Sequence, residues 1–122
     1  MRFTLETNAA ANLVRAYGPG EISINDRVLK QSLILTADAI VPDWSPQGVE
    51  SITRGDIERV LQLGPEIIVL GTGDQLVFPD KEIMAFVLGR GIGFEVMDTP
   101  AACRTYNILI HEGRRAAAAL LL

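Results

Sequence analysis

The chain has 122 residues, of which 48% are hydrophobic and 21% are charged. This composition is that of one globular domain with enough apolar material for a core, and it argues against two independent domains. Eleven basic and fifteen acidic residues give a formal net charge of −4, which argues against a general binder of nucleic acids or anionic membranes. One cysteine and one histidine exclude an internal disulfide and a Cys/His zinc site built by a single chain.

Two segments indicate where in the cell the protein is expected. The N-terminal residues Met1–Glu6 contain no apolar run of the roughly 7–15 residues that a signal peptide needs. The longest purely apolar run, Ala116–Leu122, is shorter than the roughly 20 residues that cross a bilayer. We therefore expect a cytoplasmic protein without membrane insertion, in which Ala116–Leu122 is the packed end of a helix.

The first third of the chain predicts β structure. Leu13–Tyr17 is a short apolar run that ends at a glycine-proline-glycine turn. Ile22–Ile24 alternates apolar and polar residues, Asn25-Asp26 suits a tight turn, and Val28–Leu35 reads as the next strand. These segments predict a β-hairpin.

The second half alternates helices and strands. A helix is expected from Thr53, a capping residue, to Gly64. Ile67–Leu70 predicts a central strand that is buried on both faces, Asp80–Leu88 a second helix, and Ile92–Val96 another strand. This order predicts an α/β fold in which helices cover the sheet, while the β-rich first half adds an antiparallel layer.

The last helix has the clearest signals. Thr99 suits the N-cap position and Pro100 the first helical turn. At about 100° per residue the small and apolar residues share one face, which we expect to pack in the core. These residues are Ala102, Tyr106, Leu109, Gly113, Ala117 and Leu120.

A glycine turn, Gly71-Thr72-Gly73, follows the predicted central strand, where α/β folds commonly bind ligands. A dinucleotide fingerprint needs a third glycine where Leu76 stands, and no Gly-Lys-Ser/Thr sequence forms a phosphate-binding loop. The favoured interpretation is a tight turn with a positive φ angle. The alternative is a loop whose backbone N–H groups bind an anionic small molecule.

Cys103, Asn107 and His111 bring together the residue types of a thiol hydrolase. On one helix, however, Cys103 and His111 lie about 12 Å apart along the axis, which is too far for a hydrogen bond. We therefore predict no catalytic residues and a partly buried Cys103. A thiol pKa lowered by the helix dipole is the alternative.

Metal binding is not indicated either. Asp38, Asp43 and Asp74 carry the carboxylates that suit Mg²⁺ or Ca²⁺, but their spacing follows no known loop pattern. We predict no metal and no cofactor.

The other side of the last helix is polar and mostly cationic. A solvated face with a Glu112–Arg115 pair is the default interpretation. A site for an anionic ligand or an acidic partner is the alternative. The residues concerned are Arg104, Asn107, His111, Glu112, Arg114 and Arg115.

The segment Val41–Gly48 is expected to be a loop, because Pro42 and Pro46 remove backbone donors. Trp44 lies between these prolines. It is expected to anchor the loop, with anchoring of a protein partner as the alternative.

Three stretches together resemble a known family. They are Pro65–Gly73, Gly91–Thr99 and Ala102–Arg115. They are similar to the family that includes mitochondrial NADH dehydrogenase (complex I) assembly factor 3, also described as the Mth938-like domain family. The residues that match its motif are Gly71, Thr72, Gly73, Thr105, Asn107, Glu112 and Arg114.

The resemblance implies one Mth938-like domain across residues 1–122. It would have three layers: a mixed central sheet, helices on one side and a hammerhead-like antiparallel β layer on the other. For function it implies contacts with other proteins during complex assembly and no catalytic residues. A non-enzymatic interaction or assembly module is therefore the first hypothesis, and a binder or enzyme for an anionic small molecule is the second. The candidate binding residues are Trp44, Gly71, Thr72, Gly73, Arg104, Asn107 and Glu112.

Overall fold

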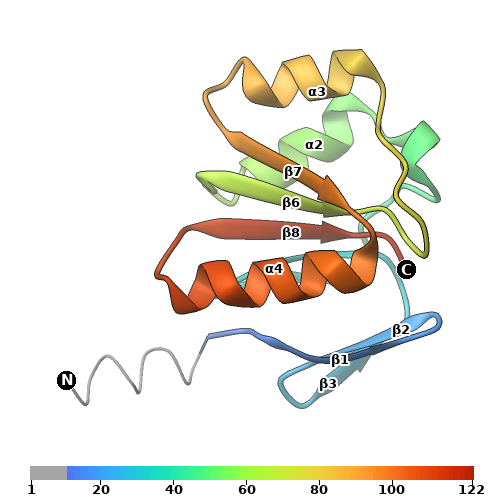
Figure 1. Cartoon of the computed structure of the whole chain (residues 1–122), viewed down its shortest axis with the longest axis vertical. Helices are drawn as coiled ribbons and strands as arrows, with labels where there is room; N and C mark the ends of the chain where they lie inside the picture. Colours follow the sequence, from blue (N-terminus) through green and yellow to red (C-terminus); the bar gives the residue numbers. More distant parts are fainter. Residues whose placement is uncertain (1–10) are drawn as a thin grey trace.

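A computed structural model describes residues 11–122. The segment Met1–Glu6, for which no secretion signal is expected, lies outside the described residues. The elements are shown in chain order in Figure 1. They are β1 (Val14–Gly18), β2 (Glu21–Ile24), β3 (Arg27–Leu29), β4 (Leu33–Thr36), β5 (Ala39–Val41), the 3-10 turn η1 (Val49–Ser51), α2 (Arg54–Leu61), β6 (Ile67–Gly71), α3 (Lys81–Leu88), β7 (Gly93–Met97), α4 (Thr99–His111) and β8 (Ala116–Leu120).

The strands form two sheets. A mixed five-stranded sheet has the order β5-β4-β8-β6-β7, and a separate antiparallel sheet has the order β1-β2-β3. Within the larger sheet β8 is parallel to β6 and antiparallel to β4, while β7 is parallel to β6. The prediction that β6 is buried along its length is confirmed, but the middle position belongs to β8.

Three layers result (Figure 1). Helices α2 and α3 cover one face of the five-stranded sheet and share a hydrophobic core with it. Helix α4 and the small β1-β2-β3 sheet cover the other face and share a second core. The predicted α/β class with a mixed sheet and an added antiparallel layer is confirmed. One helix, α4, lies on the same side as the added layer.

The largest error of the sequence-based assignment concerns Ala116–Leu122. The structure ends helix α4 at His111 and makes Ala116–Leu120 the central strand β8. Gly113 has a φ angle of +76° and redirects the chain after the helix. Alanine favours helices, but its small side chain also suits a strand packed between two layers. In this segment, tertiary packing outweighs the helix propensity of alanine.

A second correction concerns Val28–Leu35, which is two strands rather than one. β3 belongs to the small sheet and β4 to the large one. The polar residues Lys30, Gln31 and Ser32 lie between them, and the first two are exposed. These three polar residues inside the apolar run mark the point where the chain crosses between layers.

The N-cap residues predicted for α2 and α4 can also be compared with the structure. Thr53 caps α2, and its Oγ1 accepts a hydrogen bond from the Asp56 N–H as predicted. For α4 the expected cap is wrong by one residue: Asp98 is the N-cap and accepts from the Ala101 N–H at 2.9 Å. Thr99 is the first helical residue, which leaves its hydroxyl free for the contacts described next.

Candidate functional site

The Gly71-Thr72-Gly73 turn is held by the first residue of α4. The Gly73 N–H donates to Thr99 Oγ1 at 2.8 Å, and the Thr99 N–H donates to the Gly73 carbonyl at 2.9 Å. The Thr99 hydroxyl in turn donates to the Leu121 carbonyl at 2.6 Å. Since Thr99 is fully buried, one hydroxyl joins the end of β6, the start of α4 and the residue after β8.

Gly71 makes this close approach feasible. A Cβ atom at position 71 would lie 2.9 Å from Thr99 Oγ1 and 3.0 Å from the Thr99 Cα. Backbone cannot move away as a flexible side chain can, so any larger residue would push α4 from the sheet. The glycine is therefore explained by packing.

The predicted positive φ angle is confirmed at Gly73, where φ is +97°. The Thr72 N–H donates to the Met97 carbonyl at 2.9 Å, and the Gly73 N–H is taken by Thr99. Two of the backbone donors that an anion would need are thus already used inside the protein. This hydrogen bonding favours the structural interpretation of the turn.

The Thr72 side chain organises the loop that follows. Its hydroxyl donates to the Gln75 carbonyl at 2.5 Å and accepts from the Val77 N–H at 3.3 Å. Thr72 itself is only 8% exposed. A buried hydroxyl thereby holds the backbone at Gln75 and Val77, within the loop from Asp74 to Asp80 that connects β6 to α3.

Three consecutive large apolar side chains in this loop face solvent. Leu76 is 52% exposed, Val77 46% and Phe78 64%. Adjacent exposed apolar residues are unusual on a protein surface and commonly mark an interaction site. The sequence analysis missed them, although a three-residue apolar run outside any predicted helix or strand is a signal that could have found them.

The same region is acidic. Asp74 and Asp80 are exposed at the two ends of the loop. The pKa of Tyr17 is raised, first because the side chain is partly buried and then because of the negative charges of Asp74 and Asp98. The carboxylates of Asp74 and Asp98 therefore act on the same part of the molecule, at the end of the sheet where β6 and β7 finish.

On α4, the candidate residue Asn107 is engaged with β1. Its Oδ1 accepts from the Val14 N–H at 2.9 Å, and its Nδ2 donates to the Val14 carbonyl at 2.8 Å. The Asn107 side-chain amide thus makes the two hydrogen bonds to Val14 that the backbone of a neighbouring strand would otherwise make. Arg104 and Glu112 are exposed on the same helix, so the polar face has a solvated part and a structural part.

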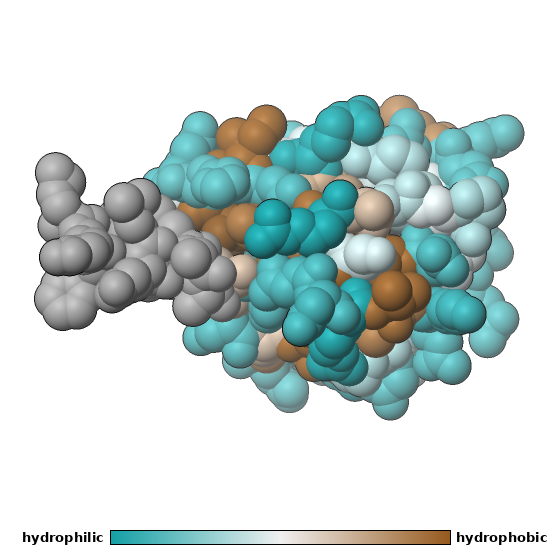
Figure 2. Space-filling view, turned by 90° about the horizontal axis from the view of Figure 1, so that it is seen from below, coloured by the Kyte–Doolittle hydropathy of each residue, from teal (hydrophilic) through white to brown (hydrophobic). Residues whose placement is uncertain are grey.

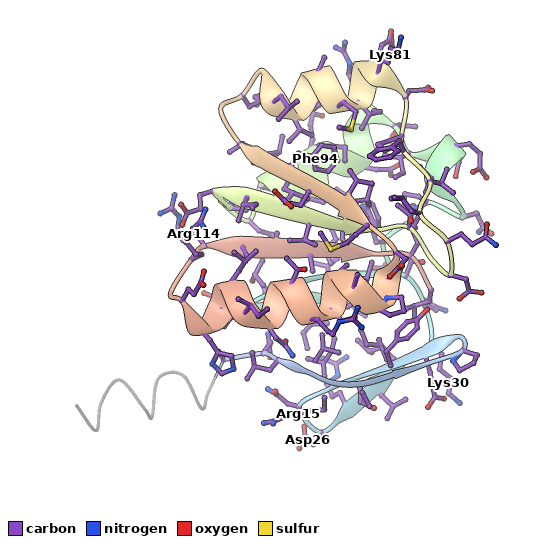
Figure 3. All side chains as sticks on the ribbon, in the orientation of Figure 1. Arg15, Asp26, Lys30, Lys81, Phe94 and Arg114 are labelled. Atoms are coloured by element: carbon purple, nitrogen blue, oxygen red, sulfur yellow. The ribbon has the colours of Figure 1, made fainter. Side chains whose placement is uncertain are left out.

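The expected Glu112–Arg115 pair is replaced by contacts with Glu66. The Arg115 N–H donates to Glu66 Oε2 at 2.9 Å, and Arg114 Nε lies 3.5 Å from the same oxygen. These contacts lower the pKa of Glu66. Arg114 lies at the turn between α4 and β8 (Figure 3), beside a cleft of about 540 Å³.

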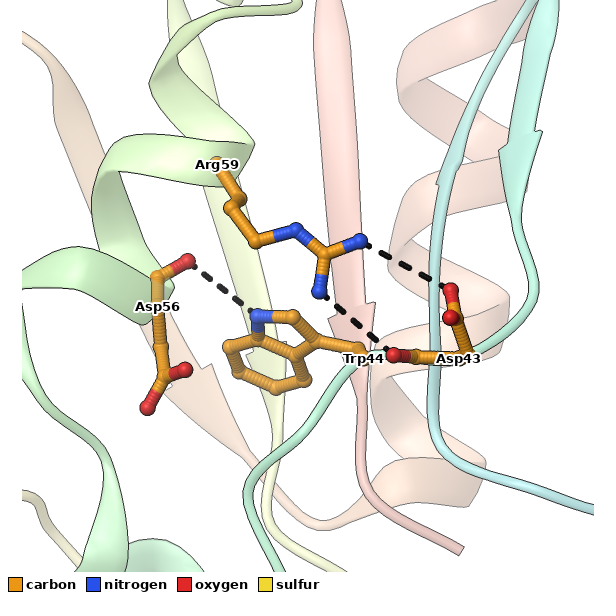
Figure 4. Close-up of polar contacts among 4 residues, drawn as sticks. All are labelled: Asp43, Trp44, Asp56 and Arg59. Carbon is orange, nitrogen blue, oxygen red and sulfur yellow. Dashed lines mark hydrogen bonds and ion pairs between the residues drawn. The ribbon is translucent and has the colours of Figure 1, made fainter.

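Trp44 is an anchor of its own loop. Only 3% of the residue is exposed, and its Nε1 donates to the Asp56 carbonyl at 3.1 Å (Figure 4). Beside it, Arg59 forms an ion pair of 3.6 Å with Asp43 and donates to the Asp43 carbonyl. The favoured interpretation of Trp44 is confirmed, and in this structure the indole offers almost no surface to a partner.

Cys103 is buried, with 4% of the residue exposed. Burial raises the pKa of its thiol to about 12, and the opposing effect of Arg104 is smaller. The alternative of a lowered thiol pKa is therefore wrong. Across residues 11–122, no group of three or more His, Cys, Asp and Glu side chains could hold a metal ion.

The candidate residues do not form one site. Gly71, Thr72 and Gly73 meet Thr99 at the end of β6, whereas Trp44 packs in the core beneath α2 and α3. Asn107 lies on the opposite face of the sheet, against β1. The structure thus singles out the Asp74–Asp80 loop as the candidate interaction site, and the glycine turn as the support of that loop.

Comparison with known proteins places these features in a family. A family model described as "Protein of unknown function (DUF498/DUF598)" matches residues 14–121. The human protein "NADH dehydrogenase [ubiquinone] 1 alpha subcomplex assembly factor 3" is 35% identical over 116 residues, which cover 93% of this chain and 62% of the human protein. The chain thus spans less than two thirds of that relative.

Solved structures agree with the fold. A crystal structure of a Bordetella parapertussis protein is 38% identical, with a TM-score of 0.86, and the match covers 92% of this chain and 96% of that one. A Bordetella pertussis protein described as a Mth938-like domain is 31% identical, with a TM-score of 0.80 and coverage of 92% and 86%. The chain therefore belongs to the DUF498/DUF598 family and has the Mth938-like fold.

Proposed function

We propose that the chain is a non-enzymatic protein-interaction module that contributes to the assembly of a larger complex. The observation that carries the proposal is the Asp74–Asp80 loop, which presents Leu76, Val77 and Phe78 to solvent on a backbone fixed by Thr72. The human relative is named as an assembly factor of NADH dehydrogenase, which supports the same class of function. By analogy, the complex to test first is the respiratory NADH dehydrogenase.

The experiment is a gene deletion in the protein's own host, complemented with wild-type or variant chains. We expect the deletion to lower the amount of assembled NADH dehydrogenase, measured on native gels and as NADH oxidation by isolated membranes. Wild type should restore assembly, whereas Phe78→Ser should not.

The matched control is Ile108→Ser. Ile108 on α4 is 57% exposed, close to the value for Phe78, so this change removes a similar apolar surface elsewhere. It should restore assembly fully. An unchanged level of the complex in the deletion strain, or full restoration by Phe78→Ser at equal protein level, would contradict the proposal.

The second hypothesis, a small-molecule binder that uses the glycine turn, has less support because the Thr72 and Gly73 N–H groups already have partners. Ligand-dependent thermal stabilisation across a metabolite set tests it directly. We place the assembly role in the cytoplasm, which fractionation of host cells tests. Among residues 11–122, no helix is long and apolar enough to cross a membrane.

A further inference from the structure

We propose that the Asp74–Asp80 loop binds a protein partner whose surface offers an apolar pocket bordered by lysine or arginine side chains. The inference rests on the proposed function and adds the chemistry of the partner. It follows from two properties of the loop, its fixed shape and its charge.

The shape of the loop is set before any partner arrives. The Thr72 hydroxyl bridges the Gln75 carbonyl and the Val77 N–H, and Thr99 holds Gly73 at the start of the loop. At the other end, Pro79 is buried and Asp80 accepts from the Ile83 and Met84 N–H groups through its carbonyl. A loop fixed at both ends and in the middle loses little conformational entropy on binding. Its apolar side chains therefore suit insertion into a pocket.

The acidic side chains of the loop indicate which residues should surround the partner's pocket. Among residues 74–82, the acidic side chains Asp74, Asp80 and Glu82 and the one basic side chain, Lys81, are exposed. Figure 3 shows Lys81 at the start of α3. The ion pairs formed within residues 11–122 are Arg59–Asp43 and Arg114–Glu66, and neither uses a carboxylate of the loop. Basic side chains around a partner's pocket would be complementary to these free carboxylates.

Two other occupants fit the charges less well. A bilayer surface that carries anionic lipids would repel Asp74 and Asp80. In a symmetric dimer the loop of one copy would meet the loop of the other, which would bring like charges together at an apolar contact. The charge pattern thus favours a different protein with a basic rim.

The experiment begins with a photo-crosslinking residue, benzoylphenylalanine, at position 78 of the full chain in host cells, with the same residue at position 108 as control. We expect position 78 to give a crosslink to one protein, at a peptide that combines apolar residues with lysine or arginine. That protein is then purified and titrated with the full chain and its variants.

In the titration, the double variant Asp74→Lys/Asp80→Lys should bind at least tenfold more weakly than wild type, and Phe78→Ser likewise. The control Glu21→Lys/Asp26→Lys makes the same change in net charge at exposed positions of the small sheet, and Figure 3 shows Asp26 at its far end. It should bind like wild type. Replacing the lysine or arginine residues of the partner's crosslinked peptide with glutamate should restore binding to Asp74→Lys/Asp80→Lys.

Several results would overturn the inference. They are a crosslink to peptides of this chain itself, equal crosslinking from positions 78 and 108, and unchanged affinity of the Asp74→Lys/Asp80→Lys variant. Flotation of the purified chain with phosphatidylcholine or phosphatidylglycerol vesicles, lost in Phe78→Ser, would also overturn it in favour of a membrane surface. If the deletion strain assembles its complex normally while the titration behaves as expected, the proposed function fails and the partner chemistry stands.

Discussion

Thr99 is the residue on which the end of the sheet depends. Its buried hydroxyl accepts from Gly73 and donates to Leu121, so Thr99→Val would leave a donor and an acceptor without partners. We expect a loss of about 1–3 kcal/mol in the free energy of unfolding, measured by urea denaturation. Thr99→Ser retains the hydroxyl and should lose less. If the valine variant were as stable as wild type, the hydroxyl would not hold these segments together.

Cys103 gives a prediction about pH. Because burial raises the thiol pKa to about 12, almost no thiolate exists in the native protein at pH 8, whereas the unfolded thiol has an ordinary pKa of about 8.5. We expect iodoacetamide to react at least about a hundredfold more slowly with native than with urea-unfolded protein at pH 8. Comparable native and unfolded rates would show an accessible thiolate.

The same shift links stability to pH. A native pKa above the unfolded value means that the native state keeps its proton while the unfolded state loses it. The contribution of Cys103 is therefore complete below about pH 8.5 and is lost as the pH rises towards 12. Replacing Cys103 with serine should remove this part of the alkaline decline in stability.

At the scale of elements, Gly113 separates α4 from β8. Its φ angle of +76° is one that L-residues rarely adopt, so Gly113→Ala should lower the free energy of unfolding by about 1 kcal/mol. Gly18→Ala is the control, because Gly18 has no positive φ angle and a Cβ there would meet nothing within 4 Å. Urea denaturation of both variants measures the difference. Equal stability of the two variants would contradict this role for Gly113.

Local signals explain which elements were predictable. The start of α2 was predicted because Thr53 and Asp56 cap it through neighbours in sequence, and β6 because its apolar run is bounded by turn residues. The alanines of β8 carry no such signal, since their strand form depends on β4 and β6, which lie far away in the sequence.

The candidate site was predictable only in part. The glycine turn was found because glycines after a strand are a local pattern. The exposure of Leu76, Val77 and Phe78 could not be predicted. Whether an apolar run is buried or exposed depends on which other elements pack against it, and these are distant in the sequence. The role of Thr99 was likewise hidden, since its partners Gly73 and Leu121 are 26 and 22 residues away.

At the scale of the whole molecule, most large apolar side chains of residues 11–122 are buried, and of the seven that are exposed three lie in the Asp74–Asp80 loop. Seen from the side of the small sheet, hydrophobic residues lie in separate areas among hydrophilic ones (Figure 2). β7 is one of the two edge strands of the large sheet, the other being β5, and the central residue of β7, Glu95, is exposed. A charge on an edge strand discourages pairing with another sheet.

We therefore expect Glu95→Val to promote self-association, measured as an increase in mass with concentration by light scattering after gel filtration. Glu58→Val, at an exposed position of α2, removes the same charge and adds the same apolar group away from any edge. It should keep the mass of wild type. A Glu95→Val protein that stays at that mass would show that the edge is protected by other means.

The position of β8 has a consequence for synthesis. This strand follows every other described strand in the sequence, yet it lies between β4 and β6 in the sheet. While the nascent chain leaves the ribosome, the β4–β5 hairpin and the β6–β7 pair have no strand to join them until residues 116–120 emerge. During that interval the apolar edges of β4 and β6 are open to chaperones or to other nascent chains.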